Sequence, residues 1–200
     1  MNNELIDKIK SIIAKSDESA IATVRDIEKA IAEAEAPNFK GKTPGDHFMY
    51  RGIEWVILDW EQGGVLCVTA EPIGNMAFDK NGNNNWRESS LREYLNTVFL
   101  AELGEDDALL TIQSDLVADN GDDSYGTAVD YVGLLSCDLY REYRDLIPRY
   151  KTWIWTCTPW ACDPTYAYCV RGVISSGVLY NSEAGYASGV VPACVFIDNQ

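Results

Sequence analysis

The chain has 200 residues, of which 46% are hydrophobic and 24% charged, a composition typical of one folded domain with a short appendage. Its formal net charge is −15, and residues 102–145 hold twelve acidic residues against two arginines. A surface of that sign repels phosphate backbones and anionic lipids, so we expect no nucleic-acid partner and no membrane partner. No apolar run reaches the length of a membrane helix, and residues 1–5 show no signal-peptide pattern.

Histidine, on which zinc enzymes and Ser-His-Asp hydrolases rely, is nearly absent, which excludes most histidine-dependent chemistry. His47 is the single histidine, and its surroundings predict a partly exposed residue at the start of a strand. Six cysteines occur without a CxxC pair, so we expect reduced and mostly buried thiols. They are Cys67, Cys137, Cys157, Cys162, Cys169 and Cys194. No P-loop, GxGxxG, GxSxG or HExxH motif is present, and we expect no catalytic residue, no metal and no cofactor.

Residues 1–36 are predicted to be helical, because apolar or small residues recur at spacings of three and four from residue 3 to residue 35. One irregular step falls at residues 16–19 and leaves two interpretations open. A single helix would form a coiled-coil stalk and make the protein a homo-oligomer such as a trimer. Alternatively, Ser16 caps a second helix, and an antiparallel pair packs on the domain. Residues 37–44 are a predicted linker, and residues 45–200 the main domain.

The main domain has alternating signals for strands and helices, which predicts an α+β fold. Strands are predicted at residues 48–51, 53–60, 65–70, 131–135 and 193–197. Helices are predicted from Ser90, with Glu93 as the capping-box partner, and from Ser136 up to Pro148. Another helical turn is expected within residues 103–112. The oxygen-rich loops at residues 79–85 and 119–126 could surround calcium, but neither has an EF-hand pattern.

Gly45-Asp46, residues 52–59 and residues 83–96 together resemble one uncharacterised bacterial and phage family, domain of unknown function 6273. Residues 52–59 (Gly-Ile-Glu-Trp-Val-Ile-Leu-Asp), with Gly45-Asp46 before them, are similar to the opening of that family. Residues 83–96, from Asn-Asn-Asn-Trp-Arg to Tyr-Leu-Asn, are similar to its most recognisable segment. Residues 132–136, 155–159, 177–180 and 189–193 follow in the family's order. The resemblance covers about residues 44–198.

The end of this family is similar to the C-type-lectin-like fold of the formylglycine-generating-enzyme branch, which includes phage receptor-binding proteins. The resemblance implies a twisted antiparallel sheet, two helices and a loop-rich segment that presents a binding face. Two family arginines are absent here, since Thr156-Cys157-Thr158 and Val191 occupy their places. Either those arginines form buried ion pairs that this chain lacks, or they contact a ligand that this chain does not share.

The segment after residue 152 is rich in aromatic residues and poor in charge, a composition typical of recognition surfaces. Trp153 and Trp155 are two residues apart and are expected on one side of a strand; we assign Trp153 to the core and Trp155 to the binding surface. Trp160 is expected in an exposed loop. The candidate ligand-binding residues are Trp155, Thr156, Trp160, Asp163, Tyr166, Tyr168, Tyr180, Asn181, Glu183 and Tyr186.

These observations favour a non-catalytic recognition domain that binds a protein or glycan, such as a phage or prophage surface component. Its expected location is the virion surface or the cytoplasm. A second hypothesis is an acidic intracellular inhibitor or structural subunit that acts through residues 102–145. A third is an enzyme of the formylglycine-generating type, which would need two cysteines near one another beside a cleft.

Overall fold

The computed structural model describes residues 3–15, 26–27, 37–61, 63–104 and 108–198. It divides the chain into one unit of residues 1–38 and a compact unit of residues 39–200. In the first unit, α1 (Asn3–Lys15) is an amphipathic helix, and residues 26–27 are also helical. The choice between a stalk and a folded-back pair depends on residues 16–25 and 28–36, which lie outside the described residues.

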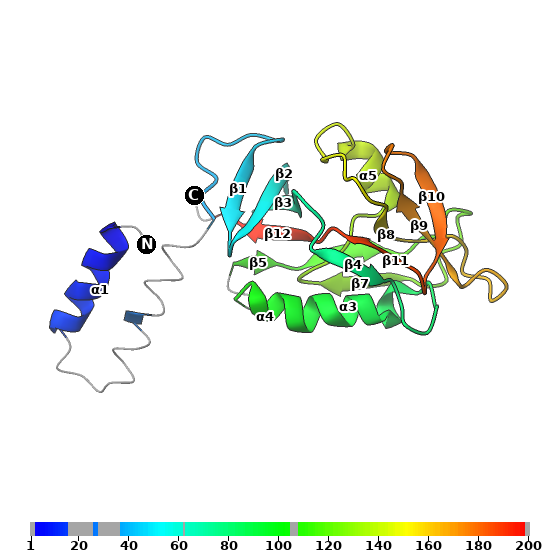
Figure 1. The fold of residues 1–200 in the computed structure, drawn as a ribbon, viewed down its shortest axis with the longest axis horizontal. Helices are drawn as coiled ribbons and strands as arrows, with labels where there is room; N and C mark the ends of the chain where they lie inside the picture. The colour runs from blue at the N-terminus through cyan, green and yellow to red at the C-terminus, as the bar shows by residue number, and fades with distance from the viewer. Residues whose placement is uncertain (1–2, 16–25, 28–36, 62, 105–107, 199–200) are drawn as a thin grey trace. The chain divides into compact units, whose positions relative to one another are not determined.

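The compact unit is a mixed α+β structure whose strands are mostly antiparallel (Figure 1). Its strands are β1 (His47–Tyr50), β2 (Ile53–Glu61), β3 (Gly64–Thr69), β4 (Gly74–Ala77), β5 (Leu109–Leu110), β6 (Ile112–Asp115), β7 (Thr127–Asp130), β8 (Ile154–Pro159), β9 (Cys169–Val173), β10 (Leu179–Glu183), β11 (Ala187–Val190) and β12 (Ala193–Ile197). Its helical segments are a 3₁₀ turn (Trp86–Glu88), α3 (Ser90–Tyr94), a π-helical turn (Leu95–Phe99), α4 (Leu100–Glu102) and α5 (Cys137–Tyr143). None of the helices in the described part of the chain is long and apolar enough to span a membrane.

Two five-stranded sheets make up most of the compact unit. The first has the order β1-β2-β3-β12-β5, and every neighbouring pair in it is antiparallel. The second has the order β10-β9-β8-β11-β4, in which β11 and β8 are the parallel pair. β6 and β7 form a separate two-stranded sheet. The strand β12 therefore lies inside the first sheet, between β3 and β5, although it follows both in the chain.

Around residues 55–58 of β2, along β3 and along most of β12, the first sheet is buried on both faces. Alternate residues of β2 point to opposite faces, so Trp55 and Ile57 enter one hydrophobic cluster while Val56 and Leu58 enter another. We call the first cluster core one and the second core two. Core one also contains Cys67, Cys194 and Phe196, and core two also contains Leu66, Val68 and Val195. Such double burial explains why β2 and β3 read as nearly continuous apolar runs in the sequence.

Helical segments lie against each core. The stretch from α3 to α4 places Leu91, Leu95, Phe99 and Leu103, each four residues apart, in core one. α5 and the loop after it place Tyr140, Tyr143, Ile147 and Tyr150 in core two. In Figure 1, α3 and α4 lie on one side of the compact unit and α5 on the other. Tyr143 also donates a hydrogen bond to the Asp59 carboxylate, at 2.9 Å between oxygens.

The segment at residues 83–96, which carries the clearest family resemblance, has structural roles throughout. Trp86 is fully buried, and its indole N–H donates to Asp130 Oδ2 at 3.0 Å. Arg92 Nε donates to the other oxygen of that buried carboxylate at 2.7 Å. The Asn96 side chain donates to the Val132 carbonyl and accepts from two backbone N–H groups. The segment therefore joins α3 to the chain around β7 through satisfied buried polar groups.

Several local expectations are confirmed, and several need correction. β1 to β3 and β12 lie where the strands are predicted, and Ser136 caps α5 by accepting from the Leu139 N–H. The cap of α3 is Ser89 and not Ser90, whose hydroxyl accepts from the Lys80 N–H. The prediction of a helical turn within residues 103–112 is wrong for the end of that range, where β5 pairs with β12 and β6 begins its pairing with β7.

Two further boundaries differ from the expectation. Residues 131–135 are mostly buried but form only one bridge, between Gly133 and Ala193, in place of the expected strand. α5 ends at Tyr143, before Pro148, because the chain turns there to bring Ile147 and Tyr150 into core two. In addition, Phe39 is buried against Phe48 and Phe196, so the segment assigned to the linker contributes a side chain to core one.

Candidate binding surface

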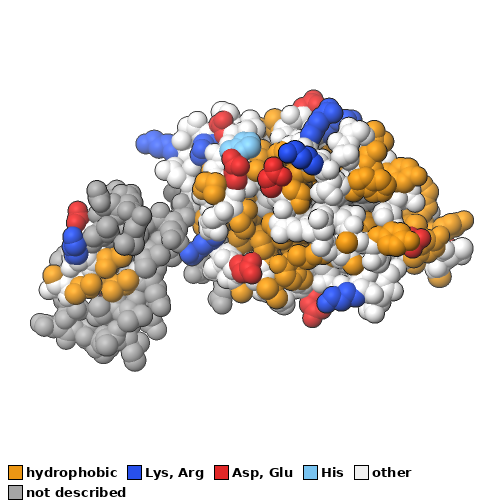
Figure 2. Space-filling view, viewed as in Figure 1, with side chains coloured by type: hydrophobic (Ala, Val, Ile, Leu, Met, Phe, Trp, Pro, Cys, Tyr) orange, Lys and Arg blue, Asp and Glu red, His pale blue; other side chains and the backbone are white. Residues whose placement is uncertain are grey.

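Five large aromatic side chains are exposed along the β9–β10 hairpin and the segments beside it. We call this set the aromatic surface; it consists of Trp153, Tyr166, Tyr168, Tyr180 and Tyr186. β10 is an edge strand, and Tyr180 near its start is 53% exposed. Tyr186, in the turn after β10, is 61% exposed. Figure 2 shows hydrophobic side chains gathered at the end of the compact unit where β10 lies.

The two tryptophans before and inside β8 are placed opposite to the expectation. Trp155 is 2% exposed, packs edge-on against Phe78 and donates its indole N–H to the Met76 carbonyl, so it is removed from the binding surface. Trp153 precedes β8, is 43% exposed, and meets the Tyr180 ring at 5.7 Å between centroids. The physical reason is that all six residues of β8 are buried, so the first exposed position lies outside the strand.

The other candidate residues divide into buried, half-buried and exposed positions. Thr156 is also removed from the surface, because its buried hydroxyl donates to the Arg171 carbonyl. Trp160 lies outside the strands, as expected, but it is half-buried and not exposed, because the Arg171 guanidinium lies 5.2 Å from its ring centroid. Asn181 is half-buried on β10, and Glu183 is exposed at the end of that strand.

Asp163 is exposed and organises the loop that carries Tyr166. Its carboxylate accepts from the Thr165 N–H at 2.8 Å. The hydrogen bond from the Thr165 hydroxyl, and to a smaller extent that from the Thr165 N–H, holds the pKa of Asp163 below its usual range. The Asp163 carbonyl also accepts from the Tyr166 N–H. The Asp163 side chain therefore stabilises the turn and is also exposed to solvent.

Asn84 holds the loop at residues 161–169 against the rest of the unit, a role that sequence analysis missed. Its side chain is fully buried and donates to the carbonyls of Ala161 at 2.9 Å and Cys169 at 2.7 Å. Its side-chain oxygen accepts from the Tyr125 hydroxyl at 2.8 Å. All hydrogen-bonding groups of the amide are thus used inside the protein. Asn84 fixes both ends of the loop that presents Tyr166 and Tyr168.

The asparagine-rich loop at residues 79–85 is organised by the Asp79 carboxylate. Asp79 is buried and accepts from three backbone N–H groups, those of Asn81, Asn83 and Ser90. These bonds satisfy the carboxylate without a metal ion. Across the part of the chain that the structure describes, no three His, Cys, Asp or Glu side chains are grouped so that they could hold a metal.

A polar groove of about 480 Å³ lies between β6, residues 117–119 and the start of α5. Asp119 in its wall is 3.7 Å from Arg141 Nη2 and 3.7 Å from Arg171 Nε. Since Arg171 also lies over Trp160, this wall is connected to the loop of the aromatic surface through an ion pair and a cation–π contact. The groove has the size of a small-molecule site and a polar lining.

The six cysteines are free thiols, and all except half-buried Cys162 are buried. Burial raises the pKa of Cys157 to about 12, and burial also raises the pKa values of Cys67 and Cys194. Thiols of this kind are protonated near neutral pH and are poor nucleophiles. His47 is exposed at the start of β1, as expected, with Nδ1 3.0 Å from Glu54 Oε1.

Comparison of the chain with protein-family models, curated proteins and solved structures finds no match.

Proposed function

We propose that this chain is a non-catalytic recognition protein that binds a protein or glycan through the aromatic surface. The observation that carries the proposal is the exposure of five Trp and Tyr side chains on one hairpin and the segments beside it. Exposed aromatic groups offer large contact area at low entropic cost, and a hydroxyl or indole N–H for specificity. The edge-to-face contact of Trp153 and Tyr180 restricts both rings before a ligand arrives.

The proposal includes the finer assignments made from the resemblance. The compact unit is a C-type-lectin-like domain of the family called domain of unknown function 6273, on a phage or prophage surface. Its mostly antiparallel sheets, the helical segments packed on its two cores and its largely exposed loop at residues 161–168 support that assignment. Residues 3–35 join copies of the chain, so that a weak site is repeated and gains avidity.

The acidic segment at residues 102–145 is less suited to a partner than the aromatic surface. Four of its carboxylates are already engaged inside the chain. Asp119, Asp130 and Asp138 pair with arginines, and Asp122 accepts hydrogen bonds from Ser124. A carboxylate paired with an arginine contributes little to a long-range field, which applies to three of these four. The same pairing gives these residues structural roles in the loop before β7 and at the start of α5.

The test is a screen of the full chain against glycan and protein arrays, followed by paired variants. The double variant Trp153→Ala/Tyr180→Ala should lose at least about tenfold in affinity for any ligand found, because aromatic anchors carry most of the binding energy. Met49→Ala is the matched control, since Met49 is 61% exposed on β1, in the other sheet. Absence of any ligand at high protein concentration contradicts the proposal. A ligand that the double variant binds as tightly as the parent chain does also contradicts it. If charge reversal at Asp122 and Asp123 abolishes binding of the ligand, the acidic segment is favoured instead.

A further inference from the structure

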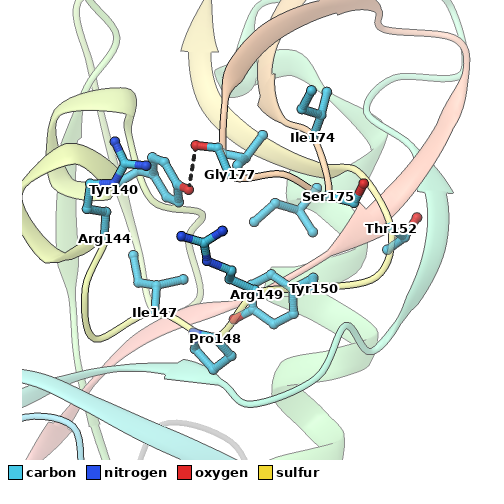
Figure 3. A pocket seen from close by; sticks show the side chains of 12 residues that line it. Tyr140, Arg144, Ile147, Pro148, Arg149, Tyr150, Thr152, Ile174, Ser175 and Gly177 are labelled. Carbon is cyan, nitrogen blue, oxygen red and sulfur yellow. Dashed lines mark hydrogen bonds between the residues drawn. The ribbon is translucent and has the colours of Figure 1, made fainter.

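A small pocket beside core two differs in charge from the rest of the molecule. It lies between the end of α5, the loop at residues 144–150 and the turn between β9 and β10, and has a volume of about 20 Å³. Arg144 and Arg149 line it, together with the hydroxyl-bearing residues Tyr140, Tyr150, Thr152 and Ser175. Figure 3 shows both arginine side chains reaching toward Tyr140 from the two ends of the loop that follows α5.

No carboxylate lines this pocket, although the chain has 31 acidic residues against 16 basic ones. Among the described contacts, neither Arg144 nor Arg149 has an ion pair or hydrogen bond. In contrast, Arg92, Arg141 and Arg171 each lie within 3.7 Å of an aspartate oxygen. Two guanidinium groups without a carboxylate partner among the described residues give this concave site a local charge of +2. At contact distance, the negative charges elsewhere on the chain offset this local charge only in part.

The pocket wall holds its groups in place. The Tyr140 hydroxyl donates to the Gly177 carbonyl at 3.1 Å, which joins α5 to the β9–β10 turn. Gly177 has φ of +84°, and a side-chain carbon there would lie 3.3 Å from the Tyr140 hydroxyl and 3.8 Å from Arg144 Nη2. The glycine therefore leaves the approach to Arg144 open. Burial raises the pKa of Tyr140, while the charges of Arg144 and Arg149 oppose that rise, as their closeness requires.

We infer that this pocket binds a doubly charged tetrahedral oxyanion, namely a terminal phosphate or sulfate group. Two guanidinium groups match a dianion in charge, and their N–H donors suit its several oxygens. The enclosed volume holds about one water molecule, so the oxyanion binds at the open mouth of the pocket and the remainder of a ligand stays in solvent. Carboxylate monoanions leave one guanidinium uncompensated and bind more weakly.

This site is separate from the aromatic surface. Ile154 and Val173, which line the pocket, belong to core two, whereas Trp155 belongs to core one. On β10, Leu179 pairs with Val173 and Tyr180 with Gly172, so these neighbours point to opposite faces of the sheet. The inference does not rest on the proposed function, and each can fail alone.

The test is titration of the full chain with sodium phosphate, sodium sulfate and sodium acetate at constant ionic strength, followed by amide chemical shifts and calorimetry. Saturable shifts of the Ser175 and Gly177 amides are expected with phosphate or sulfate. The affinity for acetate is expected to be at least about tenfold weaker, since a charge-assisted hydrogen bond contributes about a factor of ten. The stronger of the two dianions identifies the source as phosphate or sulfate.

The double variant Arg144→Gln/Arg149→Gln should lose at least about tenfold in affinity, with unchanged thermal stability because both side chains are exposed and unpaired among the described contacts. Lys80→Gln/Arg87→Gln removes the same charge outside the pocket and should change the affinity less than about twofold. Three results overturn the inference: no saturable binding, equal affinity for acetate and the dianions, or equal loss in both double variants.

Discussion

At the scale of single residues, the buried polar side chains determine where the exposed ones are presented. Asn84 holds both ends of the loop at residues 161–169, and Asp79 holds the loop that positions Asn84. Sequence analysis can see that this stretch is a loop, because asparagine and glycine favour turns. It cannot see which carbonyls the amide meets, since they lie 77 and 85 residues further along the chain.

Replacement of Asn84 tests this role. Asn84→Ala leaves buried carbonyls and the Tyr125 hydroxyl without their partner, and should lower the free energy of unfolding by about 2–4 kcal/mol. Urea denaturation measures the loss, with Asn81→Ala as the control at a less buried position of the same loop. A loss no larger than that of the control contradicts the bracing role.

A second prediction concerns the turn at Asp46, whose carboxylate accepts from the Thr43 N–H and hydroxyl. These bonds hold the pKa of Asp46 below its usual 3.8, so the unfolded chain takes up the proton first. The stabilisation is therefore complete only well above the unfolded-state pKa of 3.8, and it decreases as the pH falls from there through the lower folded-state pKa. Asp46→Asn should destabilise the protein at pH 7 and have a smaller effect near pH 3.

Urea midpoints at the two pH values measure this difference. Asp145→Asn is the control, because Asp145 is exposed and has no hydrogen bond among the described contacts. An Asp46→Asn effect that is the same at both pH values would show that the carboxylate charge does not stabilise the turn.

At the scale of secondary-structure elements, the close approach of β3 to β12 depends on one glycine. A side-chain carbon at Gly64 would lie 2.5 Å from Val195 Cγ1 and 2.9 Å from the Phe196 carbonyl oxygen. Gly64→Ala should therefore push the two strands apart and destabilise the protein by about 1–3 kcal/mol. Gly185→Ala meets no atom within 4 Å and is the matched control, expected within about 0.5 kcal/mol of the parent chain.

Thermal and urea denaturation of both variants measure this contrast. Equal stability of the two alanine variants would mean that β3 and β12 can separate without cost at this position.

Element boundaries were predictable where the signal is local. The turn at Arg51-Gly52, the alternation around it and the cap at Ser136 need only neighbouring residues, and those elements are correct. The exposed side of β8 could not be predicted from neighbouring residues, because Ile154 enters core two while Trp155 enters core one. Alternation is present in that strand, but both of its sides are buried, so it carries no information about exposure. For that reason the burial of Trp153 and Trp155 was assigned the wrong way round.

At the scale of the whole molecule, the α+β class followed from the sequence, whereas the strand order did not. Strand order depends on contacts between distant segments, such as β12 with β3 and β5. The composition of the aromatic surface was predicted in large part, because exposed Tyr residues follow turn signals that the sequence displays. The arginine pocket was not predicted, since Arg144 and Arg149 become neighbours of Ser175 only through the packing of α5.

The expected oligomer is tested by the mass of the full chain in solution. If residues 3–35 form a stalk, the full chain is an oligomer such as a trimer, and a chain of residues 38–200 is a monomer. The truncation keeps Phe39, because this ring is buried against Phe48 and Phe196. Light scattering gives both masses, and denaturation checks that the shorter chain is folded. A monomeric full chain contradicts the stalk and removes the gain in avidity.

The position of β12 also determines when the protein can fold during its synthesis. The first sheet lacks the strand between β3 and β5 until residues 193–197 have left the ribosome. Until then, β3 and β5 each expose an unpaired edge, and Phe196 is missing from among Phe39, Phe48, Tyr50 and Trp55. We therefore expect a nascent chain stopped before residue 193 to be a substrate for chaperones and proteases, since only a chain translated through Ile197 can complete this sheet.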